Sequence, residues 1–236
     1  NTPLTLGNCL VKSKTKQILI SNGIKTPKHF TCELNYLPSP KELKLKFPLI
    51  LKLLREDASI GISEYSVVKS FNELVSHSKF LFETFNQKLI AEEYIEGREL
   101  NVAILGQSVL PISEILFDGL PDGLPKIVTY EGKWIAESIY YENTKPKCPA
   151  ELSAQIKKRV EAIALKAFNA LGCRDYARVD IRLDKNGIPF VIEVNPNPDI
   201  SPDAGFAAAL QAAGIPYELF VFTVLENANK RLKVNL

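Results

Sequence analysis

RVDIRLDKNGIPFVIEVNPNPDISP, residues 178–202, decides the fold, because it predicts a hairpin with acids on one face. Polar and apolar residues alternate along its first strand, as in a strand with one buried face. Asn-Gly between two such runs is a strong signal for a two-residue turn. Counting outward from that turn gives three cross-strand pairs: Lys185–Ile188, Asp180–Glu193 and Arg178–Asn195.

Two carboxylates directly opposite each other destabilise a strand pair unless something compensates their charge. A divalent cation would do so, since Asp, Glu and Asn supply the hard oxygen ligands that Mg²⁺ takes together with substrate phosphates. The alternative is a solvated outer face on which Arg178 and Arg182 offset the acids. Three prolines in residues 196–202 predict a rigid loop beside the acids, which favours the ligand site over the surface hairpin.

Composition narrows the function further. The 236 residues are 46% hydrophobic, enough for one large core or two small ones. The net charge of +2 is scattered, so we expect no nucleic-acid partner and no membrane patch. Four distant cysteines exclude a zinc site and predict a reduced, cytoplasmic setting, and no apolar run approaches the ~20 residues of a membrane span. Because the chain starts with Asn and lacks Met, we expect a fragment or processed product.

Periodicity and turn residues predict alternating helices and strands of an α+β protein. A buried strand should end near Lys52, followed by a loop of small and polar residues whose backbone N–H groups suit phosphate. Two lobes should meet near residues 92–97. The other expected elements are helices at 12–22, 72–85, 150–171 and 217–228, and strands at 88–97 and on both sides of 106–107.

The order of these features is informative. A strand lysine with a small-residue loop, an acid-rich linker, a second lysine and then R-x-D-x₁₂-E-x-N resembles the ATP-grasp ligases, specifically the D-alanine–D-alanine ligase branch. The resemblance runs from about residue 10 to residue 225. It implies an ATP-grasp fold with two α+β lobes clasping ATP. By this resemblance, residues 1–95 are expected to form the small lobe, with the amino-terminal helix and phosphate loop, and 96–236 the large lobe, with the lid loop and metal-binding hairpin. The family's upstream α/β domain has no counterpart in this chain.

The resemblance also implies a nucleotide site. Lys12 and Lys52 match lysines on the α and β phosphates, Ser59 keeps a hydroxyl in the phosphate loop, and Lys133 matches a lysine on the mobile lid. The remaining adenosine contacts are Glu92 near the adenine, the linker backbone of Tyr94 and Ile95 at the ring edge, and Glu99 at the ribose hydroxyls.

For the chemistry, the resemblance implies that Asp180, Glu193 and Asn195 bind two Mg²⁺ ions, with Mn²⁺ as an alternative. Arg178 matches the arginine that steadies the acyl phosphate, so Arg178 and Lys133 are the catalytic candidates. The implied reaction is ATP-dependent joining of a small-molecule carboxylate to an amine through an acyl phosphate. A homodimer is compatible with this family.

Alternative functions stay open at the level of sequence. A carboxylate–thiol ligase or a carboxylate kinase shares the same ATP site. From a different class, the chain could be a catalytically reduced ATP-binding module. The intact set of site lysines, arginine and metal ligands favours the enzyme.

Departures from the family concern mainly the acceptor end. Leu53 replaces the usual proline after the strand lysine, and Asp57-Ala58 replaces Gly-Ser in the phosphate loop. We expect the Asp57 side chain to face solvent or cap a backbone N–H, because it would otherwise repel a nucleotide. Trp134 and Pro198-Asp199-Ile200-Ser201 of the proline loop also differ, so the acceptor site is expected to be altered. Asp199 and Asp203 either bind an amine or stiffen that loop.

Overall fold

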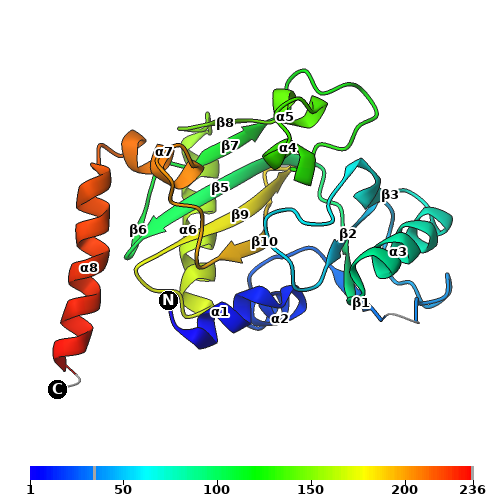
Figure 1. Cartoon of the computed structure of the whole chain (residues 1–236), viewed down its shortest axis with the longest axis horizontal. Coiled ribbons are helices and arrows are strands. Elements are labelled where there is room, and N and C mark those ends of the chain that lie inside the picture. The colour runs from blue at the N-terminus through cyan, green and yellow to red at the C-terminus, as the bar shows by residue number, and fades with distance from the viewer. Residues whose placement is uncertain (34–35, 235–236) are drawn as a thin grey trace.

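The computed structural model describes residues 1–33 and 36–234 and is built on two antiparallel sheets (Figure 1). The first sheet has the strand order β1-β4-β2-β3. Helix α3 (Phe71–Phe85) covers it and buries Leu74 and Leu81 in the same core as Leu51. The strands of this sheet are β1 (His29–Cys32), β2 (Leu49–Leu53), β3 (Val67–Val68) and β4 (Leu89–Glu93).

The second sheet has the order β10-β9-β5-β7-β8, with β6 paired to β5. Its strands are β5 (Gly97–Leu105), β6 (Ser108–Val109), β7 (Ser113–Leu116), β8 (Lys145–Lys147), β9 (Tyr176–Asp184) and β10 (Pro189–Asn195). Apolar residues of β5, β9 and β10 form a core with helices α2 (Lys12–Ser21) and α6 (Ala154–Ala170). The predicted α+β class is therefore confirmed.

The hairpin β9–β10 has the predicted pairs at its site end but not at its turn. Asp180 lies opposite Glu193 and Arg178 opposite Asn195. The pairing of Lys185 with Ile188 was wrong. The Asp184 N–H donates to the Ile188 carbonyl at 3.0 Å, which leaves a three-residue loop, 185–187.

Two features explain this difference. Gly187 has φ +69°, the left-handed conformation that ends three-residue hairpin loops. The Asp184 side chain accepts hydrogen bonds from the Asn186 and Ile188 N–H groups at 2.9 and 2.8 Å, which stabilises the longer turn. A β-bulge between Val191 and Glu193 then shifts the register by one residue and restores the predicted pairs beyond it.

The polar face of β9 is covered rather than solvated. Asp180 is only 7% exposed and Arg182 only 4%. The solvated-surface alternative for this hairpin is therefore wrong. Buried charges require partners, so the contacts of these two side chains define the site described below.

Local sequence explains where the helices begin. Ser70 caps α3, with its Oγ accepting from the Glu73 N–H at 3.3 Å, and the Glu73 carboxylate accepts from the Lys69 N–H at 2.8 Å. The helical predictions at 12–22, 72–85, 150–171 and 217–228 correspond to α2, α3, α6 and α8 (Tyr217–Val234). Four helices and one 3₁₀ turn were not predicted: α1 (Pro3–Leu10), α4 (Tyr130–Trp134), α5 (Ile139–Asn143), α7 (Gly205–Ala212) and η1 (Glu64–Ser66).

Figure 1 shows α8 at the end of the molecule away from the first sheet, connected to the second sheet through α7. Phe206 and Phe220 of these helices pack in a separate core with Ala103 of β5. In the described ranges, no helix is by itself long and apolar enough to cross a membrane. Helices α7 and α8 reach that length and composition only as a pair bent by 102°.

The chain passes from the first sheet to the second between Glu93 and Gly97. A division into lobes at residues 95 and 96 stays a prediction. Cys9 of α1 and Leu19 of α2 pack in the core of the second sheet, although the prediction placed the amino-terminal helix in the first lobe.

Candidate active site

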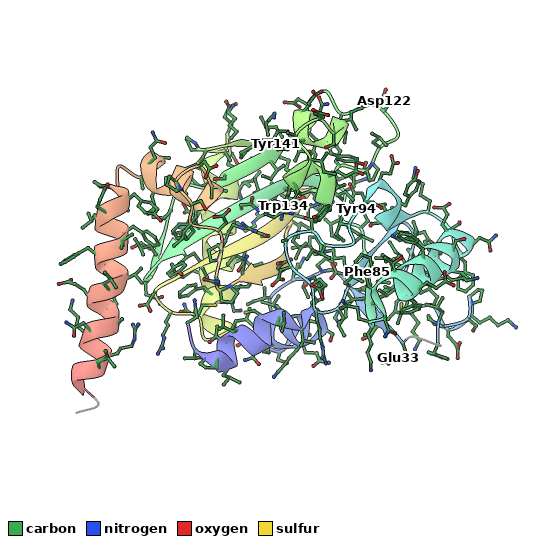
Figure 2. All side chains as sticks on the ribbon, viewed as in Figure 1. Glu33, Phe85, Tyr94, Asp122, Trp134 and Tyr141 are labelled. Atoms are coloured by element: carbon green, nitrogen blue, oxygen red, sulfur yellow. The ribbon has the colours of Figure 1, made fainter. Side chains whose placement is uncertain are left out.

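One cavity of about 1190 Å³ is lined by residues of both sheets. Figure 2 labels Tyr94 and Trp134, which lie on its wall near the passage between the sheets. All twelve predicted site residues line it: Lys12, Lys52, Ser59, Glu92, Tyr94, Ile95, Glu99, Lys133, Arg178, Asp180, Glu193 and Asn195. Residues up to 183 positions apart in the sequence therefore share one site, while their individual roles stay proposals.

Glu92 is the centre of a buried charge network. Its Oε1 lies 3.2 Å from Lys16 Nζ, and its Oε2 lies 3.1 Å from Lys52 Nζ. Burial opposes ionisation of this carboxyl, but the charges of Lys16 and Lys52 outweigh burial and lower the Glu92 pKa to about 2. Burial also lowers the Lys16 pKa to about 8, against the attraction of Glu92. The network therefore keeps a cationic Lys52 at the cavity wall at neutral pH.

Lys16 was not among the predicted site residues. It is 1% exposed and also donates to Thr26 Oγ1 at 3.0 Å. The sequence did contain a signal, since Lys12 and Lys16 are four residues apart and share one face of a helix. Only the position of β4 shows that Lys16 faces an acid.

Lys12 lies at the start of α2, next to the phosphate-loop segment. Its Nζ donates to the Glu56 carbonyl and lies 3.8 Å from Asp57 Oδ1. The Asp57 side chain is 54% exposed, but it also lines the cavity, so it is not turned away from the site as expected. Burial and the charge of Glu193 raise its pKa, and Lys12 opposes them. The lysine thus offsets an acid that would otherwise repel a nucleotide.

The expected phosphate loop is hydrogen-bonded to the segment that carries Lys133. Ser59 Oγ donates to the Val128 carbonyl at 2.9 Å, and Trp134 Nε1 donates to the Ala58 carbonyl at 3.2 Å. Ala58 and Ser59 both have positive φ, 54° and 60°, an uncommon conformation outside glycine. These contacts place Lys133 of α4 on the cavity wall, where burial and the charge of Arg178 lower its pKa.

Arg182 organises the linker between the sheets, and its role was not predicted. Its guanidinium donates to the carbonyls of Ile95 and Lys126 at 3.1 and 2.7 Å, and to Glu99 Oε2 at 3.2 Å. It also lies over the Tyr94 ring, 5.2 Å from the centroid. The Tyr94 N–H donates to the Pro48 carbonyl at 3.1 Å. Two backbone groups of the predicted adenine linker, the Tyr94 N–H and the Ile95 carbonyl, therefore have protein partners.

Glu99 is held in the same region. Burial raises its pKa, while the charge of Arg182 opposes that effect. Its partner, Arg182, is itself buried, so the pair is shielded from solvent.

The hairpin acids meet an arginine and an asparagine. Arg178 Nε and Nη2 donate to Asp180 Oδ1 and Oδ2 at 2.7 and 2.8 Å, and Asn101 Nδ2 donates to Oδ1 at 2.9 Å. The charge of Asp180 raises the Arg178 pKa, so the guanidinium stays ionised. Asn195 Oδ1 accepts from the Asn197 N–H at 3.0 Å, which orients the amide oxygen.

The donor chemistry of the hairpin fits Mg²⁺. Asp180, Glu193 and Asn195 offer two carboxylates and one amide oxygen on neighbouring positions of β9 and β10. Over residues 1–33 and 36–234, no three side chains of the His, Cys, Asp and Glu types gather into a metal cluster. This composition suits a cation that takes only one or two protein carboxylates and completes its shell with phosphate oxygens.

The loop after β10 forms the end of the cavity at which the acceptor was expected. Asp199 and Asp203 both line it. Asp199 Oδ1 accepts from the Ser201 N–H at 2.8 Å, and hydrogen bonding to Ser201 lowers the Asp199 pKa. Because this hydrogen bond lies within the loop, it supports the expectation that Asp199 stiffens the loop.

The chain is similar to known proteins in family, sequence and structure. The family model described as D-ala D-ala ligase C-terminus matches residues 22–226. An uncharacterized protein of Sinorhizobium fredii is 31% identical over 96% of the chain, and a D-alanine–D-alanine ligase of Nitrosomonas eutropha is 33% identical over 91%. In both cases the chain spans 65% of the relative's length.

Solved structures agree with the sequence matches. The D-alanine–D-alanine ligase of Bacillus anthracis complexed with ATP has a TM-score of 0.79 and 29% identity, covering 99% of this chain and 70% of that one. The VanG D-Ala:D-Ser ligase of Enterococcus faecalis has a TM-score of 0.75 and 25% identity, covering 94% and 62%.

Proposed function

Because the chain belongs to the family of D-alanine–D-alanine ligase C-terminal domains, we propose that it is the ATP-binding, catalytic part of a carboxylate–amine ligase. The predicted ATP-grasp fold is confirmed by the similar solved structures. The proposed reaction forms an amide or peptide bond through an acyl phosphate. The observation that carries this proposal is one cavity, lined by both sheets, in which lysines, buried acids, Arg178 and Arg182 converge.

The proposal gives the lysines the task of holding the triphosphate. Lys12 and Lys133 line the cavity beside the phosphate loop, and Lys52 is kept cationic by Glu92. Ammonium groups bind phosphate as point charges, and desolvation strengthens that attraction. The bonds of Ser59 and Trp134 across the loop would hold the Lys133 segment against the nucleotide and limit access of water.

Asp180, Glu193 and Asn195 are the residues that would hold Mg²⁺, or Mn²⁺ in its place. The ions would supply neutralisation of charge on the β and γ phosphates. Arg178 lies opposite Asn195 on the same hairpin and would stabilise charge that develops at the acyl carbon. Its high pKa in this environment suits a group that must stay charged throughout.

The acceptor is proposed to differ from D-alanine. The loop 196–204 brings Asp199 and Asp203 to the cavity, and Trp134 occupies the position after the lid lysine. These changes lie at the acceptor end, whereas the residues proposed for ATP are retained. We therefore propose only the substrate classes, a small carboxylic acid and an amine. We also propose a cytoplasmic setting, with which the four free cysteines agree. A homodimer is a further part of the proposal.

The test is a screen for ADP release with panels of carboxylic acids and amines, followed by mass spectrometry of the product. We expect ADP and phosphate only when an acid and an amine are both present, together with a product of their combined mass less water. Arg178→Ala should lower the rate by about 10²–10³-fold, the usual effect of removing one such donor.

Other results point elsewhere. Turnover with an acid and a thiol, but with no amine, would identify a carboxylate–thiol ligase. Nucleotide binding without ADP release in any combination would favour the catalytically reduced ATP-binding module and contradict the ligase.

A further inference from the structure

Asn101 has no role in the site assigned so far, yet its side chain lies within it. It belongs to β5 and is paired directly with Asp180 of β9 in the second sheet. Its side chain lines the cavity, and its Nδ2 donates to Asp180 Oδ1 at 2.9 Å. A cross-strand neighbour on a central strand has little freedom to move, so this contact is built into the sheet.

The Asp180 carboxylate has two kinds of partner. Arg178 bonds both oxygens, at 2.7 and 2.8 Å, in the bidentate geometry of a guanidinium and a carboxylate. Asn101 bonds one oxygen and carries no charge. With Asp180 only 7% exposed, solvent contributes little to fixing its orientation.

These partners differ in their compatibility with a bound cation. Arg178 engages both oxygens that a divalent cation would need, and its positive charge opposes a second cation at short range. The Asn101 amide occupies one lone pair of Oδ1 and leaves Oδ2 and the other lone pair for metal. Were Arg178 to turn toward a substrate, the Asn101 hydrogen bond would be the contact that still holds the carboxylate in place.

We propose that Asn101 is a positioning residue that fixes the Asp180 carboxylate for a divalent cation after Arg178 has left it. This inference rests on the proposed metal-dependent nucleotide site. Groups that orient metal ligands typically change metal affinity by about 10–100-fold when they are removed. Nucleotide contacts that do not involve the metal should be unaffected, since Asn101 touches Asp180 and none of the three lysines.

The experiment uses Asn101→Leu, which keeps the side-chain volume but removes the donor. Asn101→Ser, which keeps a shorter donor, is the second variant. Asn169→Leu is the matched control, because it also removes a hydrogen bond between side chains, to Gln107, at an exposed position outside the cavity. Free Mn²⁺ is measured by electron paramagnetic resonance during titration of the 236-residue chain with a non-hydrolysable ATP analogue at saturation. Nucleotide affinity without metal and Tm are measured in parallel.

We expect Asn101→Leu to weaken the apparent Mn²⁺ affinity at least about tenfold, with Asn101→Ser intermediate and Asn169→Leu unchanged. Tm and metal-free nucleotide affinity should stay at wild-type values. If wild type shows metal-dependent binding and both Asn101 variants retain its Mn²⁺ affinity within twofold, this inference is overturned and the proposed function is untouched. If wild type shows no metal-dependent binding, the proposed function fails and this inference fails with it.

Discussion

Lys16 and Glu92 form a buried ion pair in which Nζ and Oε1 are 3.2 Å apart and each side chain is 1% exposed. Glu92 also pairs with Lys52 on its other oxygen, so one carboxylate balances two ammonium groups. Removing one member of a buried pair leaves an uncompensated charge, which is costly even where the intact pair contributes little. The network therefore links the stability of the first sheet to the charge presented to the cavity.

Glu92→Gln should lower the free energy of unfolding by about 3–5 kcal/mol, because Lys16 and Lys52 lose their counter-charge. Urea denaturation followed by circular dichroism measures this change. The control is Glu83→Gln on α3, whose partner Lys79 is an exposed i,i+4 contact, and it should change stability by less than about 0.5 kcal/mol. Equal effects of the two substitutions would contradict a stabilising network at Glu92.

The same carboxylate predicts an acid limit. Its pKa is about 2 in the folded chain, against an ordinary value of 4.5, so the unfolded chain binds more protons between these values. Stability from Glu92 is therefore fully present above pH 4.5 and is lost as the pH falls toward 2. The free energy of unfolding measured from pH 6 to pH 3 should fall more steeply in wild type than in Glu92→Gln. Parallel curves would contradict the depressed pKa.

Trp134 is the single tryptophan of the chain and stands beside Lys133 on the cavity wall. It is 59% exposed and donates to the Ala58 carbonyl of the proposed phosphate loop. A nucleotide that fills the cavity should reduce its exposure, so tryptophan emission should shift to shorter wavelength on addition of an ATP analogue. Trp134→Phe controls for ligand absorbance and tyrosine emission. Binding detected by calorimetry with no change in tryptophan emission would place the nucleotide away from α4.

Gly97 permits β5 to begin directly against β9. Its φ is +146°, and a Cβ at this position would lie 2.0 Å from the Leu183 carbonyl oxygen. Gly97→Ala should therefore destabilise the chain by more than about 2 kcal/mol, measured by chemical denaturation. Gly106→Ala is the matched control, since Gly106 also has positive φ but meets no atom within 4 Å, and it should cost about 1–2 kcal/mol. A smaller loss at position 97 than at position 106 would contradict the close approach.

The sequence predicted the Asp180–Glu193 pair of the hairpin but not the turn that connects its two strands. Asp180 and Glu193 were paired correctly because a bulge after Val191 compensates a turn one residue longer than expected. Asn-Gly favours a two-residue turn, but the Asp184 side chain bonds two N–H groups of the longer loop. Bulges and side-chain-supported turns depend on partners that alternation alone does not reveal.

Residues that act through others were the ones missed. Lys16, Arg182 and Asn101 support Glu92, Glu99 and Asp180, respectively. Each belongs to an element far in sequence from its partner, so only the strand order brings them together. Helices α1 and α7 were missed because Leu4 and Leu6 are exposed and α7 is rich in alanine, which weakens any apolar periodicity.

The most direct test is calorimetric titration of the chain with a non-hydrolysable ATP analogue, with and without Mg²⁺. Wild type and Glu83→Gln should bind more tightly with Mg²⁺, and Glu193→Gln should lose most of that gain while retaining its metal-free affinity. Such a result would establish the metal site at the β9–β10 hairpin. Binding that is independent of Mg²⁺, or equal Mg²⁺ dependence in wild type and Glu193→Gln, would contradict the central claim that the cavity is a metal-dependent ATP site.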